Sequence, residues 1–391
     1  MSEVTKPIML DETGIAIKDA CLAIRDAVLG HVTPTDDGNP AVRSVVDRWL
    51  RFDPTDKQGL VIKAGTQIKK SNGDYESYLT DTQVSFTGLT AGKDYFVNLA
   101  DDGTITANLT KLGTGVTIGR FHTLCVAAGT MNMIAPSSGI AVNGDFMVKS
   151  YREDEDPDFY EFYKKKVISV TTQTQYDVVT VEHPLSGFGA GDILPESVWC
   201  LTWHPECLNE DAMVYDRDTG KAIDVYLQSG KGLSTMSRYN VAHTVSRSPW
   251  NHQEDMRQVG KRLLRDFEFT SAAIGSNEKT NIYGSADAST VGGHKDTANR
   301  RMISAIGCEE MCGYLYQWLD EIAPAGGSAW ADDDGHGSFG QEYGAPYVLL
   351  AGGDWNHAAL CGSRCRYSGS VRSAVSAGVG GRGASRVCRH A

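Results

Sequence analysis

The closing segment of this chain, residues 350–391, is rich in glycine and poor in large apolar side chains. Two glycine-rich frames, Gly352-Gly353-x-Trp355 and Gly380-Gly381-Arg382-Gly383, bracket a Gly362-Ser363-Arg364 triplet. After Asp354 the segment holds six arginines and no Asp or Glu. Such a composition cannot bury enough apolar surface to form a core of its own. It predicts a rigid frame that holds exchangeable side chains at a surface, and it offers no pair of residues suited to proton transfer.

The composition of the whole chain narrows the class of protein. A length of 391 residues, 41% of them hydrophobic and 22% charged, predicts two or three globular domains. The net charge of −12 argues against a nucleic-acid partner, since phosphate binding requires a basic surface. No run of eighteen apolar residues occurs, so we expect no membrane insertion. The first residues lack the pattern of a secretory signal, and we expect synthesis in the bacterial cytoplasm.

Several clusters could in principle bind metal, and each is better explained without it. The pairs Cys308/Cys312 and Cys361/Cys365 have a spacing that zinc accepts, but neither has histidine partners nearby. The carboxylates of the acidic run 151–158 could bind calcium, but charge runs are usually solvated faces. The loop 331–337 lacks the spacing of a helix-loop calcium motif, which favours a solvated loop. Nine cysteines without compact spacing favour free thiols. We therefore predict no metal and no cofactor.

The first 55 residues predict a separate N-terminal assembly or attachment segment. Apolar residues recur at a period near 3.6 over 11–30, which indicates an amphipathic helix. A turn-forming cluster at 34–40, rich in Pro, Asp and Gly, ends it. This helix could associate with a second copy or pack on the domain that follows, and the pattern alone leaves both open.

Residues 56–155 predict a β-sandwich domain. Apolar and polar residues alternate in four runs, and Asn72-Gly73 and Asp102-Gly103 mark turns between runs. Short strands at nearly regular spacing are typical of antiparallel sandwiches. The predicted strands are 61–68, 83–86, 94–99 and 104–107.

Residues 156–391 predict a larger domain that mixes strands and helices. Strand patterns occur at 166–170, 176–181, 198–203 and 223–227. Ser248 followed by Pro249 resembles a helix start, and 260–275 is interpreted as a second helix that Gly275 ends. The predicted fold class of the chain is therefore α+β.

Two stretches together resemble a known group of proteins. The first comprises Lys261-Arg262-Leu263, Glu268-Phe269 and Ala272-Ala273-x-Gly275, and the second is the closing frame from Gly352 to Gly383. This pattern is similar to the C-type-lectin-like fold shared by formylglycine-generating enzymes and the variable proteins of diversity-generating retroelements. Within that group it looks like the receptor-binding, tropism-determining proteins of phage tail fibres. The resemblance extends to sandwich stretches 62–66, 89–95 and 101–104, and it does not include the first fifty residues.

The resemblance implies that the frame stays constant while scattered positions vary, because reverse transcription randomises adenines in asparagine codons. All residue types at the implied positions are reachable from an asparagine codon, and Lys, Glu, Gln, Met and Trp, which are not reachable, do not occur there. Trp355 would anchor the frame in the core, while Arg364 and Arg382 could bond backbone carbonyls of irregular loops. The implied ligand-binding set is Asp354, Asn356, His357, Ala358, Leu360, Tyr367, Gly369, Ser370, Ala374, Ser376, Gly378 and Val379.

The function implied is recognition rather than catalysis. We expect a phage or prophage receptor-binding protein at the tail fibre tip of the virion, a homotrimer that contacts other tail proteins and binds a host-cell surface receptor, protein or glycan. One alternative is a formylglycine-generating oxidase, since Cys361 and Cys365 lie near the C-terminus, although their spacing is shorter than in those enzymes. Another is a variable protein displayed on a bacterial surface. Calcium-dependent sugar binding is disfavoured because only Trp355-Asn356-His357 is present, without the usual ligand triplet.

Overall fold

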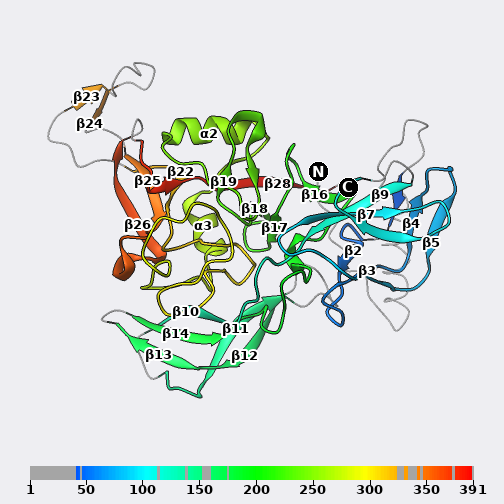
Figure 1. Ribbon diagram of the computed structural model, residues 1–391, viewed down its shortest axis with the longest axis horizontal. Helices are drawn as coiled ribbons and strands as arrows, with labels where there is room; N and C mark the ends of the chain where they lie inside the picture. Colours follow the sequence, from blue (N-terminus) through cyan, green and yellow to red (C-terminus); the bar gives the residue numbers. More distant parts are fainter. Residues whose placement is uncertain are drawn as a thin grey trace, which may run out of the picture.

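The computed structural model describes residues 41–44, 46–111, 115–136, 140–151, 160–173, 176–323, 330–332, 341–343, 347–371 and 375–389 (Figure 1). The predicted N-terminal helix at 11–30 lies outside these residues. The same holds for nearly all of the acidic run 151–158 and for the loop 333–337.

Two small antiparallel sheets, which we call the sandwich, lie in the N-terminal part, and the predicted strands 94–99 and 104–107 belong to another sheet. One has the order β1-β4-β5 and the other β2-β3-β6. Trp49, Leu60 and Phe121 are fully buried between these sheets and their neighbours. The strands are β1 (Val42–Arg43), β2 (Leu50–Phe52), β3 (Gly59–Ile62), β4 (Thr66–Lys69), β5 (Tyr75–Tyr78) and β6 (Thr82–Ser85). Two of these strands, β1 and β2, come from the predicted attachment segment 1–55.

A nine-stranded sheet combines strands from 94–122 with strands from the second half of the chain. Its order is β17-β18-β28-β16-β15-β9-β7-β8, with β21 paired to β28 (Figure 1). The last strand of the chain, β28, therefore lies inside the sheet, and the sheet contains strands from both sides of the predicted domain boundary at 155. The β9–β15 pairing places Arg120 opposite Trp199. The strands are β7 (Asp94–Leu99), β8 (Ile105–Asn108), β9 (Val116–His122), β15 (Trp199–Cys200), β16 (Trp203–Pro205), β17 (Met213–Asp216), β18 (Lys221–Asp224), β21 (Arg262–Leu263) and β28 (Gly383–Arg389).

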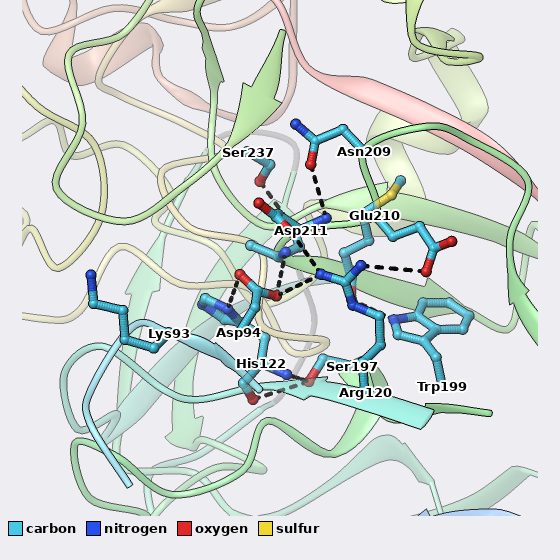
Figure 2. A network of polar contacts seen from close by, with 12 residues as sticks. Lys93, Asp94, Arg120, His122, Ser197, Trp199, Asn209, Glu210, Asp211 and Ser237 are labelled. Carbon is cyan, nitrogen blue, oxygen red and sulfur yellow. Dashed lines mark hydrogen bonds and ion pairs between the residues drawn. The ribbon is translucent and has the colours of Figure 1, made fainter. Parts of the chain in front are cut away.

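A polar network fastens this sheet where its early and late strands meet (Figure 2). The guanidinium of Arg120 lies 2.7 Å from the carboxylate of Asp211, 3.4 Å from Glu210 and 3.6 Å from Asp94. Asp94 also accepts from the backbone N–H of Ala212 and lies 3.3 Å from Nδ1 of His122. These contacts hold β7 and β9 against the segment 210–212 that precedes β17.

Several smaller sheets complete the C-terminal part. The largest has the order β26-β25-β22-β27 and lies at the end of the molecule opposite the sandwich (Figure 1). Its strands are β22 (Tyr316–Ala323), β25 (Tyr347–Gly352), β26 (Gly362–Val371) and β27 (Val379–Gly380). The others are β10 (Thr130–Pro136) with β14 (Tyr176–Glu182) and β13 (Ser169–Thr172), β11 (Asp145–Tyr151) with β12 (Tyr160–Lys166), β19 (Gln228–Ser229) with β20 (Met236–Ser237), and β23 (Trp330–Asp332) with β24 (Gln341–Tyr343).

The α+β prediction is wrong, because the described part of the chain is mostly β. It contains 28 strands and two α-helices, α2 (Pro249–Gln258) and α3 (Asp266–Ala272), besides the short 3-10 turns η1 (Pro195–Ser197), η2 (Gly232–Ser234) and η4 (Ala358–Leu360). Helix α2 begins as predicted, with the Ser248 hydroxyl accepting from the N–H of Asn251. The helix predicted over 260–275 is confined to α3, since Arg262 and Leu263 pair with β28 instead.

The eight cysteines within the described residues are all free thiols. Among those residues no helix is long and apolar enough to cross a membrane.

Candidate functional site

The predicted ligand-binding positions lie on three neighbouring segments of the β26-β25-β22-β27 sheet and its loops. Asp354 to Leu360 form the connection from β25 to β26, which includes η4. Tyr367, Gly369 and Ser370 belong to β26, and Ser376 and Gly378 precede β27. Ala374 lies outside the described residues. The described members of the predicted set therefore lie on neighbouring segments at one end of the molecule.

Asp354 organises the first of these segments. Its carboxylate accepts from the backbone N–H of Asn356 at 3.0 Å and lies 2.5 Å from Nδ1 of His357. The loop then closes through η4, with the N–H of Leu360 donating to the carbonyl of His357. Asn356, His357 and Leu360 are exposed, Leu360 to 64%, whereas Ala358 is half-buried. The hydrogen bonds that shape the loop come from the Asp354 carboxylate and backbone groups, so the exposed side chains of Asn356 and Leu360 are not needed to hold it.

Tyr316, which the sequence analysis missed, lies at the centre of the predicted set. Its ring centroid is 6.0 Å from that of His357 and 6.1 Å from that of Tyr367. Its backbone N–H donates to the carbonyl of Gly378, which brings the segment before β27 to the same place. A Cβ on Gly378 would lie 3.4 Å from a carboxylate oxygen of Asp354. Three separate segments thus surround Tyr316, and we call this surface the tip patch: Asp354, Asn356, His357, Leu360, Tyr367, Ser376 and Gly378.

The remaining predicted positions differ in their surroundings. Val379 is 5% exposed and packs with Trp318 and Leu350, so its side chain does not face solvent. Ser370 pairs with Val348 across β25 and β26. For Gly369 and Ser370 the structure describes the strand and not the side-chain surroundings.

Arg382 is the strongest single element of the frame. Its guanidinium is fully buried and donates to the carbonyls of Asp224, Val225 and Glu309 at 2.7, 2.6 and 2.5 Å, and to Oε1 of Gln317 at 3.0 Å. One side chain therefore satisfies acceptors at the end of β18, in the irregular stretch around Glu309 and in β22. The role predicted for Arg382 is confirmed.

Among the described residues Arg364 bonds no carbonyl, contrary to the prediction. It is exposed, whereas Arg366, two residues later, donates to the carbonyls of Ser363 and Cys365, both at 2.9 Å. On a regular strand these two arginines would share a face, but the pairing of β25 with β26 shifts register between the Arg366 and Gly362 positions, so Arg364 lies in an irregular stretch. Trp355 is half-buried and packs against the main core of the C-terminal part.

Neighbouring atoms lie so close to the Cα atoms of two frame glycines that no side chain fits there. Gly352 has a φ of 88°, and a Cβ there would lie 2.5 Å from the carbonyl oxygen of Met311. A Cβ on Gly362 would lie 2.0 Å from Oε2 of Glu278. The other carboxylate oxygen of Glu278 accepts from the N–H and the hydroxyl of Ser363. Burial raises the pKa of Glu278 to about 7, and the Ser363 hydrogen bonds oppose that shift.

Known proteins share this architecture. The chain is 27% identical over 374 residues to the tail fibre receptor-binding protein of Bordetella phage BPP-1, covering 87% of this chain and 82% of that protein. The M1 variant of the Major Tropism Determinant superimposes with a TM-score of 0.64, at 23% identity and 90% coverage of both chains. The P3c variant gives the same score at 22% identity, over 91% of this chain and 90% of its own. The chain has the fold of the Major Tropism Determinants. No protein-family profile matches it.

The resemblance predicted from the glycine frame is thereby confirmed, and it extends further than expected. It was predicted for residues 60–391, and the tropism-determinant fold covers about nine-tenths of the chain. The frame residues Gly352, Gly362 and Arg382 are buried in this fold, whereas five predicted positions are exposed: Asn356, His357, Leu360, Tyr367 and Ser376.

The two cysteines of the enzyme alternative lie beneath the tip patch of this tropism-determinant fold. Cys361 is buried, and its thiol donates to the carbonyls of Asp354 and His357 at 3.2 and 3.0 Å. Burial raises the pKa of Cys361 to about 12, and burial also raises that of Cys365. A thiol with a raised pKa is a poor nucleophile and a poor metal ligand at neutral pH. Within the described residues, no group of three or more His, Cys, Asp or Glu is arranged to hold a metal ion.

Sequence reasoning missed Tyr316 and Glu278 because neither lies in the closing segment. Tyr316 is the first residue of β22 and Glu278 belongs to an irregular polar stretch. No local motif distinguishes them from other strand or loop residues, and only the tertiary contacts with β26 and its preceding loop reveal their positions.

Proposed function

We propose that the chain is the receptor-binding protein of a phage or prophage tail fibre, carried on the virion, and that its tip patch binds a ligand on the host-cell surface. The relative in Bordetella phage BPP-1 is a tail fibre receptor-binding protein, and it matches this chain over most of both lengths. The fold of the Major Tropism Determinants supports the same role.

One observation carries the proposal: the most exposed aliphatic and aromatic side chains of the tip patch lie above a frame that other residues hold together. Leu360 is 64% exposed and Tyr367 50% exposed, while Arg382 and the buried glycines beneath them secure the segments. Substitution at such positions changes the surface at little cost in stability. This is the arrangement that a diversified recognition surface requires, and it supports the predicted variable set wherever the side chains face solvent.

The chemistry of the tip patch favours uncharged or weakly charged ligand surfaces. Its exposed side chains are aromatic, aliphatic or amide groups, and the Asp354 carboxylate is engaged by His357. Aromatic and amide side chains of this kind bind protein surfaces and glycan rings alike. We further propose binding without metal, and a homotrimer whose several tips compensate for modest affinity at each one through avidity.

We infer that the chain is not an enzyme. The raised pKa of Cys361 and its two hydrogen bonds to loop carbonyls support a framework role for this thiol. The enzyme alternative has a direct test: aldehyde formation on a cysteine-containing peptide in the presence of copper. Activity that disappears in Cys361→Ser would restore that alternative.

The receptor-binding proposal is tested with the full-length chain and intact cells of a panel of candidate host strains. A strain that retains the protein is identified first, and variants His357→Ala and Tyr367→Ala are then compared on it. We expect loss of retention without loss of folding. Leu79→Ala serves as the matched control, because this side chain is 88% exposed in the sandwich, far along the chain from the tip patch. Unchanged retention in both tip variants would contradict the proposal.

The diversification itself is tested on DNA. We expect a reverse transcriptase gene beside the coding sequence, with a near-copy of the region encoding 352–383 that differs at adenines. A near-copy whose differences fall on codons of buried frame residues such as Arg382 would contradict the assignment of the variable positions.

A further inference from the structure

A second segment, 278–288, runs beside the loop that carries the tip patch. The backbone N–H of Lys279 donates to the carbonyl of Cys361 at 2.8 Å, and the side-chain amide of Asn281 donates to the carbonyl of Trp355. The same amide nitrogen of Asn281 lies 3.3 Å from the hydroxyl of Ser285. The first two bonds tie this segment to both ends of the loop between β25 and β26, at Trp355 and at Cys361.

The segment is firmly anchored from below and exposed above. Ile282 is 3% exposed in the main core, and its N–H donates to the carbonyl of Gly313. The N–H of Tyr283 donates to the carbonyl of Lys295, and the hydroxyl of the buried Tyr314 donates to the carbonyl of Ala288. The side chain of Tyr283 is nevertheless 72% exposed. Lys279 and residues 284–287 are exposed as well.

We propose that residues 279–287, which we call the fixed rim, form a constant part of the receptor-binding surface, with Tyr283 contacting protein ligands whichever side chains occupy the tip patch. This inference rests on the proposed function. None of the predicted variable positions lies in the fixed rim, so its chemistry stays the same while the tip patch changes. A diversified surface with such a border keeps a share of its contact area in every variant.

Tyrosine suits this role because its large, amphipathic ring gives contact area at a low cost in conformational entropy. The backbone of Tyr283 is held by hydrogen bonds on an anchored segment, which further reduces the ordering cost of binding. Ser285 and Asp287 beside it add small polar groups that adapt to different partners. Aromatic side chains bordered by polar groups are typical of protein-binding surfaces, where they carry much of the binding energy.

The test uses the full-length chain displayed as a library, with the exposed tip-patch positions randomised by asparagine-derived codons. Binders are selected against hen lysozyme, a protein unrelated to any natural ligand, and several with unrelated tip sequences are purified. Tyr283→Ala is then introduced into each, with Leu79→Ala as the control, since that leucine is similarly exposed in the sandwich. Affinities are measured by surface plasmon resonance, and melting temperatures are recorded for every variant.

We expect Tyr283→Ala to raise Kd at least about tenfold in most binders, as for an aromatic side chain that carries much of the binding energy, with unchanged melting temperatures. Tyr283→Phe should keep most of the affinity if the ring supplies the contact. Selected binders whose Kd stays within about twofold after Tyr283→Ala would overturn the fixed rim and leave the proposed function intact. A library that yields no binder at all would instead contradict the tip patch as a recognition surface.

Discussion

Arg382 offers a quantitative test of the division between frame and surface. Substitution by methionine removes the guanidinium and keeps a long, unbranched side chain of similar reach. Four acceptors then lose their partner: three backbone carbonyls, at Asp224, Val225 and Glu309, and the side-chain oxygen of Gln317. Because Arg382 is fully buried, water cannot replace the lost donors without rearrangement of the core.

The magnitude follows from the cost of leaving these acceptors unpaired. A buried acceptor without a donor costs about 1–3 kcal/mol. Removing the buried cation recovers part of its desolvation penalty, the cause that lowers the pKa of Arg382 itself. Taking the low end for each of four acceptors gives a loss of about 4 kcal/mol in the free energy of unfolding. A domain of ordinary stability has about 5–15 kcal/mol in total, so the variant would be marginal.

The assay is urea unfolding of the full chain followed by tryptophan fluorescence and circular dichroism. Arg364→Met is the matched control, because Arg364 is an exposed arginine of the same closing segment. We expect the free energy of unfolding of this control variant to stay within about 0.5 kcal/mol of that of the parent protein. If Arg382→Met lost less than about 1 kcal/mol, the carbonyl-binding role would not be what stabilises the frame.

Three further predictions concern residues around the tip patch. Gly362→Ala should destabilise the C-terminal part by about 2–3 kcal/mol in urea unfolding, because its Cβ would lie 2.0 Å from Oε2 of Glu278, and a neutral outcome would contradict the close approach. Burial raises the pKa of Glu278 from 4.5 to about 7 in the folded chain, so the folded state keeps a proton that the unfolded state releases, and stability falls as pH rises through this window. Glu278→Gln should therefore gain on the parent protein by on the order of 3 kcal/mol between pH 4.5 and 8 in pH-dependent urea titrations, and a constant difference would refute the assignment. Tyr367→Ala and His357→Ala should shift melting temperatures by less than about 2 °C in calorimetry, and unfolding of both variants would rule out a surface role.

Part of the fold could be predicted because local patterns and tertiary structure agree there. Residues 94–99 alternate and are followed by an Asp-Gly turn, and they form β7 with the predicted bounds. Over 61–68 the alternation continues in phase through Gly65, so the run was predicted as one strand. The structure divides it into β3 and β4 at that glycine, whose φ is 82°. A period-two pattern cannot show a turn that preserves its phase.

The helix predicted over 260–275 failed for a tertiary reason. The side chain of Lys261 is buried, and its ammonium group lies 2.6 Å from the carboxylate of Asp224. Leu263 pairs with Gly383 on β28. Both partners are far away in the sequence, so no local window contains the information that makes this stretch extended. Helix α3 begins only after this pairing ends, and it has too few residues to sustain an α+β classification.

The sequence predicted the location of the candidate site from its glycine and arginine frame, and it did not reveal the tyrosines that lie beside the tip patch. Glycines that tolerate no Cβ and an arginine that bonds carbonyls leave strong marks in a sequence, since few other residues can replace them. Tyr316 and Tyr283 leave none, because a tyrosine at a strand end or in a polar loop has many explanations. What makes them relevant is their position beside segments more than thirty residues away, and only the folded chain supplies it.

This asymmetry follows from what the closing segment has to do. If recognition depended on the same contacts as folding, each new side chain in the tip patch would risk unfolding the domain, since single substitutions in a core commonly cost several kcal/mol. Here Arg382, Glu278 and the buried glycines place the stabilising contacts below the surface, where the segments meet the main core. The exposed positions above them are then free to change one at a time. Folding constrains the residue types of the frame, so one sequence is enough to recognise it. The partner constrains the exposed positions, so one sequence does not reveal the ligand.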